Sequence, residues 1–519
     1  MRTPYLLVSH TTVPYHNDLA VVFFTLCSAQ NNSLLLESAE ISSKNSLKSL
    51  LLVNAAVKIT CIGQTVTFKA LTRNGHTVLT EIEKTLQGLA ELTWSAPDIL
   101  QAIFSSLDQN LDEDSKLQSA TVFDGLRAIN NLYTHGETPI FLGGLFAYDL
   151  VANFIPTDGI QLKDDGLVCP DYVFYLAENL LRFDHPSRQA TLQTFCFNQN
   201  ERASLAQSAV SISRDLQTLP TMPAIQPAST EMATNLEDDV FKGIITSLKQ
   251  HIYMGDVFQI VPSRRFSLAC PNPLATYRQL KHNNPSPYMF YMQDDEFILF
   301  GASPESALKY NADNRQLEIY PIAGSRPRGF TADGRIDPEL DARLELEMRL
   351  DHKEQAEHLM LVDLARNDVA RVCQSGTRRV KELMQVDRYS HIMHLVSRVV
   401  GTLRPELDAL HAYQACMNMG TLTGAPKIKA MQLIYQYERQ KRHSYGGAVG
   451  YLTSDGNFDT CIVIRSAFVQ NGVAHVQAGC GEVLDSDPQM EADETRHKAR
   501  AVINAIIQTN SQAVQHRNN

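Results

Sequence analysis

The sequence predicts a mixed α+β fold from three features. Short apolar runs divided by turn residues fill the chain up to about residue 180, as expected for strands. Beyond that point apolar residues recur at helical spacing, and two Asp-Pro steps mark helix starts. The 519 residues are 44% hydrophobic and 20% charged, an ordinary globular composition with enough chain to bury a large core.

Charge and cysteine usage limit the classes of function. The net charge of −11 gives no basis for binding nucleic acid or an anionic membrane. The nine cysteines are scattered without a CxxC pair, which indicates reduced thiols and a cytoplasmic location. No apolar stretch approaches the ~20 residues of a membrane span, and the residues before Leu19 are not basic, so we expect no signal peptide.

Two N-terminal segments have contrasting patterns. Leu19–Cys27 is a short uninterrupted apolar run, for which we predict a buried strand. Residues 43–52 place several leucines on one helical face, for which we predict a helix. Between them, the run LLLES ends in the polar pair Glu37 and Ser38, which by itself is typical of a turn.

Prolines predict a domain boundary. Pro220, Pro223 and Pro227 lie among Ser, Thr and Gln, and prolines at this density break both helices and strands. We therefore expect an N-terminal α+β region at residues 1–215, a linker at 216–234 and a second domain at 235–510.

The second half begins with a predicted helix. Asn235 is a candidate cap for a helix that runs to about Met254, and Gly255 is typical of a helix end. Residues 257–261 then form a predicted strand. Gln259 inside this strand is either hydrogen-bonded in the core or faces a pocket.

Two later helices carry paired carboxylates. One is predicted from Asp337 and Pro338 through Cys373, in one or two pieces, and the other from Asp487 and Pro488. Residues three apart share a helical face, so each helix points two glutamates in one direction. The pairs are Glu354 with Glu357 and Glu491 with Glu494.

Four converging carboxylates would raise one another's pKa values unless a cation lies among them. Mg²⁺, which takes one or two carboxylates and keeps positions for an anionic substrate, fits such a group. An ordinary solvated helix face remains the alternative for either pair alone.

Several other segments allow more than one interpretation. Residues 420–427 have the look of a phosphate loop, but the spacing is one residue short and no Gly-Lys-Ser/Thr step follows, and Pro426 fits the first turn of a helix instead. Cys480 lacks the surroundings of a catalytic thiol. His394 is a core residue or a catalytic one. Arg465, inside an apolar run, needs an internal acid or a bound anion. Asp363 and Arg366 predict an internal ion pair on a helix.

Taken together, these segments resemble the chorismate-utilising enzymes over roughly residues 235–500, in order and in spacing. The motifs that carry the resemblance are GDVFQIVPSRR, GASPES, IYPIAGSRPRG, EHLMLVDLARNDV, HIMHLVS, GTLTGAPKIKAM, YGGAVGYL and AGCGEVLDSDPQMEADETRHKA. The N-terminal LLLES segment extends the resemblance to the large components of anthranilate synthases, and so to most of the chain. The resemblance implies packed antiparallel β-sheets with helices on the outside.

The resemblance also implies roles for individual residues. Metal ligands for Mg²⁺ are implied at Glu357 and Glu494, with Glu354 and Glu491 binding or supporting the metal. Glu305 is implied as the general acid at the C4 hydroxyl of chorismate, His394 as the histidine of pyruvate elimination, and Thr421 as a contact near the ring. Contacts to chorismate are implied for Gly324, Ser325, Tyr445, Arg465, Gly479, Cys480, Gly481 and Lys498.

Two positions depart from the family pattern, and two others separate its branches. Ser325 replaces the usual Thr and keeps the hydroxyl, and Cys480 replaces the usual Ala, whose backbone role should survive. Isochorismate-forming relatives carry a Lys base where this chain has Gln259, so water is disfavoured as the nucleophile. Aminodeoxychorismate synthases often carry a Lys at the position of Ala323, so ammonia must come from outside.

The implied reaction converts chorismate and ammonia into anthranilate and pyruvate, the first committed step of tryptophan biosynthesis. The chain shows no amidotransferase domain, so a separate glutaminase subunit is implied, in a complex of two plus two chains. Feedback inhibition by tryptophan is implied at Glu37, Ser38, Lys48, Pro287, Tyr288 and Met289. An aminodeoxychorismate synthase component, which does not release pyruvate, and a non-catalytic chorismate-fold subunit remain alternatives.

Overall fold

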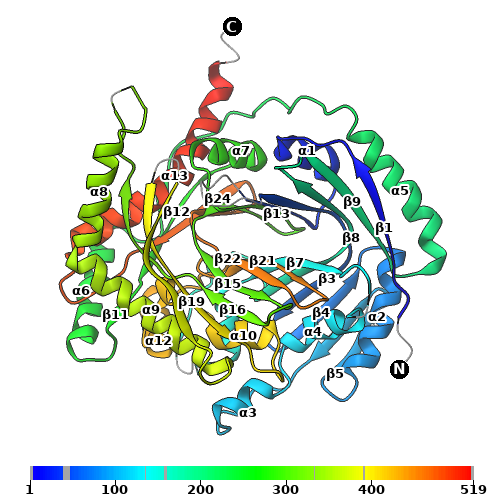
Figure 1. Ribbon diagram of the computed structural model, residues 1–519, viewed down its shortest axis with the longest axis horizontal. Helices are drawn as coiled ribbons and strands as arrows, with labels where there is room; N and C mark the ends of the chain where they lie inside the picture. Colours follow the sequence, from blue (N-terminus) through cyan, green and yellow to red (C-terminus); the bar gives the residue numbers. More distant parts are fainter. Residues whose placement is uncertain are drawn as a thin grey trace.

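Antiparallel strands dominate the computed structural model, which describes residues 4–38, 47–134, 136–156, 160–331, 333–389 and 392–515 (Figure 1). The strands form two connected series. The first series contains β1 (Leu7–Val13), β9 (Gln189–Cys196), β2 (Ser33–Glu37), β13 (Tyr288–Gln293), β14 (Ile298–Ser303), β23 (Ser466–Gln470), β24 (Val473–Gly479), β12 (Ser263–Ala269) and β10 (Ala233–Thr234).

The second series is also made of antiparallel strands. It contains β5 (Glu91–Ala96), β6 (Ile99–Ile103), β4 (Thr65–Ala70), β7 (Phe141–Phe146), β21 (Ala448–Thr453), β22 (Phe458–Ile462), β15 (Ser306–Asn311), β16 (Gln316–Ile319), β19 (Ile392–Thr402), β17 (Ile322–Pro327) and β18 (Arg379–Arg388). A separate short pair joins β11 (Gln259–Ile260) to β20 (Gly424–Ala425).

Two long strands connect the two series. β3 (Lys48–Ile62) and β8 (Tyr172–Asp184) pair along most of their length, with register shifts between Leu52 and Val57. One end of this pair joins β2 and β9, and the other joins β4 and β7. Because β-bulges bend strands and increase their twist, these irregularities allow one strand pair to serve both series.

Alternation along the strands separates two cores. In β13, Phe290 and Met292 belong to the larger apolar core, whereas Met289 and Tyr291 face a second core. Successive side chains of a strand point to opposite faces, so the first series has apolar residues on both sides. Such burial on both faces requires covering elements above and below.

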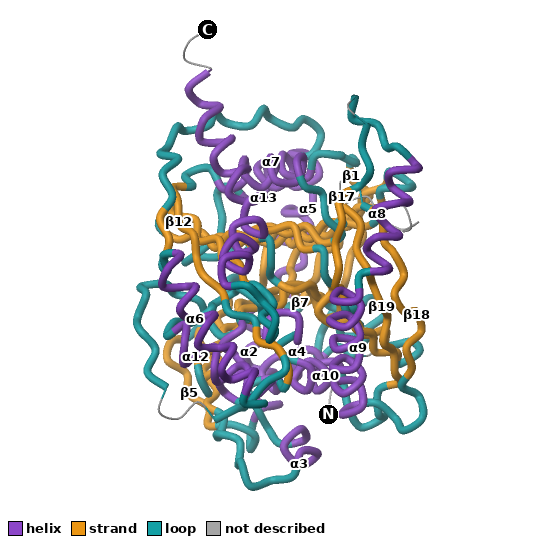
Figure 2. Tube along the Cα trace, turned by 90° about the vertical axis from the view of Figure 1, so that its left-hand side faces the viewer, coloured by secondary structure: helices purple, strands orange, loops and turns teal. Residues whose placement is uncertain are grey.

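Helices supply the cover (Figures 1 and 2). The second core is closed by α1 (Leu19–Cys27), α5 (Arg202–Asp215), α7 (Pro273–Asn283) and α13 (Pro488–Gln515). The larger core is closed by α2 (Arg73–Leu86), α4 (Phe123–Leu132), α9 (His352–Val372) and α10 (Ala409–Cys416). The other helices are α3 (Glu113–Gln118), α6 (Asp238–Tyr253), α8 (Pro338–Leu350), α11 (Gly420–Thr423), α12 (Lys427–Glu438), and the 3₁₀ turns η1 (Tyr148–Asn153) and η2 (Gln199–Glu201).

The N-terminal and C-terminal parts share sheets. β2 pairs with β13, and β7 pairs with β21, so strands from before and after the proline-rich segment lie side by side. Residues 217–232 contain neither helix nor strand. The proline-rich segment is therefore a connection within one packed body.

Two predicted elements have the wrong type. Leu19–Cys27 is the helix α1, in which Leu19, Val22 and Phe23 are buried. A continuous apolar run carries no periodicity, so it does not distinguish a buried helix from a buried strand. The predicted helix at residues 43–52 is also wrong where it can be judged, because the chain from Lys48 belongs to β3 and residues 43–46 lie outside the described ranges.

The boundaries of the later elements follow their caps closely. Asp337 accepts hydrogen bonds from two backbone amides at the start of α8, and Asp487 does the same for α13. The predicted helix near residue 235 begins later, at Asp238, because Asn235 instead accepts a hydrogen bond from the amide of Arg265.

Asp363 and Arg366 form the predicted ion pair at 2.7 Å. Among the described helices, none is long and apolar enough to cross a membrane.

Candidate active site

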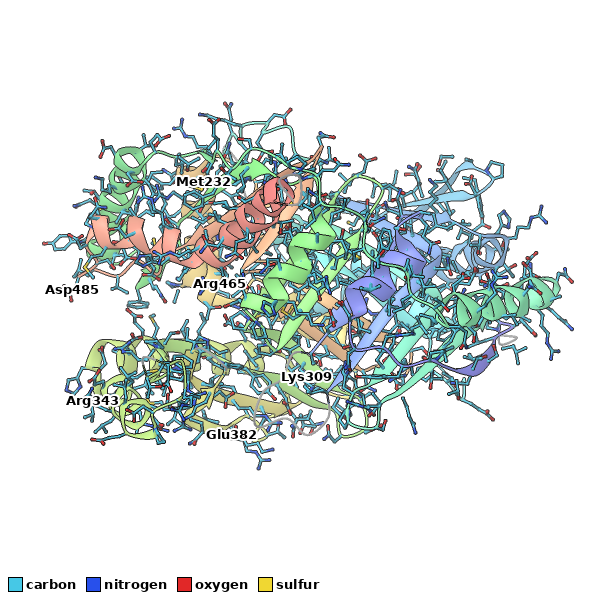
Figure 3. All side chains as sticks on the ribbon, turned by 90° about the horizontal axis from the view of Figure 1, so that it is seen from above. Met232, Lys309, Arg343, Glu382, Arg465 and Asp485 are labelled. Carbon is cyan, nitrogen blue, oxygen red and sulfur yellow. The ribbon has the colours of Figure 1, made fainter. Side chains whose placement is uncertain are left out.

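A cavity of about 470 Å³ lies where α9 and β17 approach α13 and β24. In Figure 3 the element carrying Arg343 and the segment carrying Asp485 lie on opposite sides of an opening, with Arg465 deeper in the molecule. The size of the cavity is within the usual range for a small-molecule site. Its lining comes from segments that are far apart in the sequence.

All four glutamates of the two acidic pairs line this cavity. Glu354 and Glu357 lie in the first two turns of α9, and Glu491 and Glu494 lie at the start of α13. Their spacing of three residues gives each pair one helical face, as the sequence predicts. The fold thus brings two distant acidic segments to one site.

Glu494 and Glu354 already have cationic partners. Glu494 lies 2.6 Å from Nζ of Lys498, and Glu354 lies 3.0 Å from Arg326, which also holds Asp351. Within the described ranges, no three His, Cys, Asp or Glu side chains gather closely enough to hold a metal ion by themselves. The carboxylate oxygens fit a hard cation such as Mg²⁺, provided that water and an anionic ligand complete its shell.

Basic groups face the cavity from the same side as α13. Arg465 donates a hydrogen bond to the carbonyl of Lys498, and Lys498 donates one to the carbonyl of Gly479. Burial lowers the pKa of Arg465, and among the described residues no carboxylate lies within 4.0 Å of its guanidinium. Arg465 is half-buried and forms no ion pair with a described carboxylate, although the charges of Glu494 and Glu305 partly oppose the lowering of its pKa, so its guanidinium is suited to hold a carboxylate of a ligand.

Glu305 is the carboxyl group best placed to act as an acid. It lines the cavity and is 8% exposed. Burial raises the pKa of Glu305 to about 8, and this effect is only partly opposed by Thr421, Lys498 and Arg465. The group is therefore protonated at neutral pH and able to donate a proton.

Burial shifts the pKa of His394 in the opposite direction to that of Glu305. Burial, together with the charge of Arg465, lowers the pKa of His394 to about 4. Its Nδ1 lies 2.7 Å from Oγ of Ser325, the residue opposite it on β17. A neutral imidazole in this position accepts a proton.

Close backbone approach explains two of the glycines. A Cβ on Gly479 would lie 2.7 Å from the carbonyl oxygen of Pro262, and a Cβ on Gly481 would lie 2.8 Å from Nε2 of Gln259. Both glycines line the cavity, and so do Gln259 and Ala323. A side chain at position 479 or 481 would therefore displace the cavity wall.

Cys480 is the one predicted substrate contact that does not line the cavity. It is fully buried beside Phe241 and Ala492, and its amide N–H donates to the carbonyl of Pro262. Neither its thiol nor its N–H faces a ligand. The remaining predicted catalytic, substrate and metal residues all line the cavity.

The residues predicted to bind tryptophan gather at a different place. Met289 lies opposite Glu37 where β13 pairs with β2. The buried carboxylate of Glu37 accepts a hydrogen bond from Tyr277 and forms an ion pair with Lys281, both on α7. Ser38 follows β2 directly, and Lys48 begins the neighbouring strand β3. Pro287 directly precedes β13, and Tyr288 is the first residue of that strand.

Some cavity residues carry no signal in the sequence. Asp351 and Gln477 line the cavity, and Arg326 binds both Asp351 and Glu354. Arg326 follows the Gly-Ser step at 324–325, but its partners become evident only when β17 lies beside α9. Long-range packing, and not a local motif, defines these residues.

Comparison with known proteins identifies the family to which this chain belongs. The family model described as "chorismate binding enzyme" matches residues 83–504, and the chain belongs to this family. The chain is 72% identical to anthranilate synthase component 1 of Haemophilus influenzae, over 98% of each chain. It is 53% identical to the component of that name from Escherichia coli, over 95% of each.

Solved structures agree with the fold. Anthranilate synthase component I of Streptococcus pneumoniae matches with a TM-score of 0.68 and 28% identity, over 89% of this chain and 93% of that one. The menaquinone-specific isochorismate synthase of Escherichia coli shares the fold with a TM-score of 0.68 at 18% identity, over 97% and 95%. The predicted family, α+β fold and enzymatic nature of the chain are confirmed.

Proposed function

We propose that this chain converts chorismate and ammonia into anthranilate and pyruvate, the first step of tryptophan biosynthesis. The single observation that supports this most strongly is a cavity that holds a protonated carboxyl, a neutral histidine and a half-buried arginine together. The relatives named anthranilate synthase component 1 support the choice of reaction.

In this proposal the basic side of the cavity holds the substrate. Chorismate carries two carboxylates, and Arg465 binds the one on the enolpyruvyl group. Glu357 and Glu494 hold Mg²⁺, with Glu354 and Glu491 in support. The ion, when bound, neutralises the ring carboxylate and draws negative charge toward it.

The first step is an amination with loss of water. Ammonia forms a bond to C2 of the ring while the bond from C4 to its hydroxyl breaks. Glu305 gives its proton to the departing oxygen, and the new ammonium group loses one proton to solvent, from which Glu305 is reprotonated. Gln259 and Ala323 line the cavity, and because their side chains are an amide and a methyl group, neither offers an amine as base or nucleophile.

The second step releases pyruvate. His394 takes the proton from C2, the bond between the ring and the enolpyruvyl oxygen breaks, and the ring becomes aromatic. A pKa of about 4 keeps His394 in its accepting form at neutral pH. The enol of pyruvate gains its proton as it leaves.

Ammonia is supplied by a separate glutaminase subunit in this proposal, in a complex of two plus two chains. Tryptophan binds at Glu37, Ser38 and Lys48 on one side and at residues 287–289 on the other. Since β2 and β13 are neighbours in one sheet, a ligand there can bias the packing of the strands that lead to the cavity.

One experiment tests the function. The purified chain is incubated with chorismate, Mg²⁺ and an ammonium salt, and the product is identified by mass and fluorescence. Anthranilate with an equal amount of pyruvate is expected. An aminated product that retains the enolpyruvyl group would instead identify an aminodeoxychorismate synthase. An absence of turnover would favour the alternative of a non-catalytic chorismate-fold subunit.

A further inference from the structure

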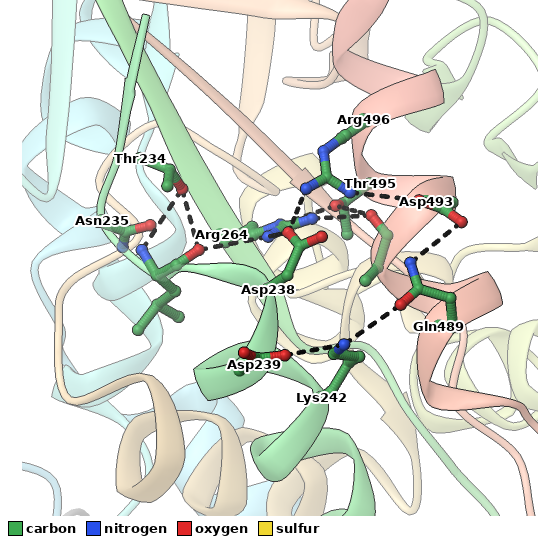
Figure 4. A network of polar contacts seen from close by, with 12 residues as sticks. Thr234, Asn235, Asp238, Asp239, Lys242, Arg264, Gln489, Asp493, Thr495 and Arg496 are labelled. Carbon is green, nitrogen blue, oxygen red and sulfur yellow. Dashed lines mark hydrogen bonds and ion pairs between the residues drawn. The ribbon is translucent and has the colours of Figure 1, made fainter.

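Arg264 connects strand β12 to the acidic turn of α13 (Figure 4). It is 1% exposed and is one of the two largest fully buried side chains among the described residues. Its Nε donates to Oγ1 of Thr495 at 2.9 Å, and its Nη2 donates to the carbonyl of Ala492 at 2.8 Å. Both contacts fall within the turn that carries Glu491 and Glu494.

The charge of this guanidinium is compensated on its other side. Nη1 donates to Asp238 at 2.7 Å and to the carbonyl of Leu236 at 3.3 Å, at the start of α6. The rings of Phe241 and Phe266 lie 4.9 and 5.3 Å from its central carbon. Arg264 thus joins β12, α6 and α13 through one rigid group.

The first turns of α13 present two neighbouring faces. Glu491, Glu494 and Lys498 line the cavity. Ala492, Thr495 and Ala499, each one position later, are at most 1% exposed and face the interior. A residue is displaced by about 100° around a helix from the one before it, so a rotation of α13 that approaches this angle would turn the carboxylates away from the cavity.

We propose that Arg264 is a positioning residue that fixes the rotation of α13 and thereby aims Glu491 and Glu494 at the metal and substrate. This inference rests on the proposed function of the cavity. The planar fork of an arginine makes four directed bonds here, which the single ammonium of a lysine cannot replace. Groups that orient metal ligands commonly change metal affinity by about 10–100-fold when removed.

The chain provides two matched controls. Arg265, the next residue of β12, is 6% exposed and binds Asp165 and the carbonyl of Lys441, away from α13. Arg496 shares Asp238 with Arg264, but its side chain is 42% exposed. Arg265→Lys therefore reports the loss of a buried arginine, and Arg496→Met reports the loss of the outer link.

The test measures cation binding without turnover. Mn²⁺, which prefers the same oxygen ligands as Mg²⁺, is titrated into each protein with chorismate present and ammonium absent, and free Mn²⁺ is read by electron paramagnetic resonance. We expect Arg264→Lys to weaken Mn²⁺ binding about tenfold or more. Arg265→Lys and Arg496→Met are expected to stay within about twofold.

Equal Mn²⁺ affinity in Arg264→Lys and the wild type would overturn the inference and leave the proposed function intact. A wild-type protein that binds no Mn²⁺ with chorismate would contradict the metal site itself. If Arg264→Lys does not fold, Thr495→Val decides, because it keeps Arg264 and removes the acceptor of its Nε, together with the hydrogen bond that Thr495 Oγ1 donates to the carbonyl of Ala492. A severalfold loss of affinity in that variant supports the inference, and no loss overturns it.

Discussion

Ser325 and His394 face each other across β17 and β19, with Oγ of the serine 2.7 Å from Nδ1 of the histidine. This contact helps to fix the orientation of the imidazole, which lines the cavity. Because the ring is buried and its pKa is lowered to about 4, it remains neutral through the physiological pH range. The pair defines where a proton can be taken from the substrate.

Replacing His394 by Met should separate the two chemical steps. Amination does not use the imidazole, so the aminated intermediate should accumulate while pyruvate release falls by about 100-fold or more. Chromatography of the products with mass detection measures both. Tyr389→Phe, which keeps the ring that lies 5.4 Å from the imidazole, serves as the control. Full anthranilate turnover in His394→Met would reject the proposed role.

Substitutions of Ser325 should affect the same step more mildly. Ser325→Ala removes the partner of Nδ1, and the loss of a hydrogen bond worth about 1 kcal/mol corresponds to about a fivefold slower release of pyruvate. Ser325→Thr retains a hydroxyl and should remain close to wild type. Single-turnover measurement of pyruvate release distinguishes the variants. Equal rates for Ala and Thr would mean that the serine does not orient the histidine.

Glu305→Gln should abolish the proton donor, lowering amination by about 100-fold or more. The pH dependence provides a second readout. Burial raises the pKa of Glu305 to about 8, so the amination rate at a fixed concentration of neutral ammonia should fall as pH rises through that value. A profile of the wild type with no change near pH 8 would argue against Glu305 as the acid.

The same substitution has a predicted effect on stability. The folded state binds the Glu305 proton more tightly than the unfolded chain, so wild-type stability falls as pH rises from about 4.5 toward 8. Glutamine carries no such proton. The free energy of unfolding of Glu305→Gln, measured relative to that of the wild type, should therefore increase as pH rises from 4 to 9. Thermal unfolding of both proteins at pH 4 and at pH 9 can measure this change.

Local signals in the sequence predict the acidic helices better than the N-terminal elements. Asp337-Pro338 and Asp487-Pro488 are true helix starts because cap and first-turn chemistry is local. Leu19–Cys27 was predicted as a strand but is a helix, because its almost uniform hydrophobicity has no period. The register of β2 against β13 depends on contacts between residues more than 250 positions apart, which no local pattern contains.

The residues of the candidate site also include some that the sequence predicts and some that it does not. Helical spacing predicts that Glu491 and Glu494 share a face, and the structure places that face on the cavity. Cys480 is misleading, because its neighbours Gly479 and Gly481 line the cavity whereas its own side chain packs beside Phe241. The role of Arg264 depends on the approach of β12, α6 and α13, which sequence spacing does not reveal.

The proposed tryptophan site makes a prediction at Ser38. Ser38→Arg places a large cation next to Glu37, whose carboxylate already binds Tyr277 and Lys281. Tryptophan should then inhibit at least about tenfold more weakly, while activity without tryptophan is unchanged. Inhibition curves at fixed chorismate measure this. If Ser38→Arg remains as sensitive as wild type, the tryptophan site lies elsewhere.

The source of ammonia can be tested on the chain alone. The reaction proposed for the cavity needs free ammonia, and Gln259 and Ala323 supply no amine of their own. The purified chain should therefore form anthranilate with ammonium salts, faster at higher pH as the neutral ammonia fraction rises, until Glu305 loses its proton near pH 8. With glutamine as the only nitrogen source it should form none. Glutamine-dependent turnover by the pure chain, verified free of other proteins, would show that no separate glutaminase subunit is required.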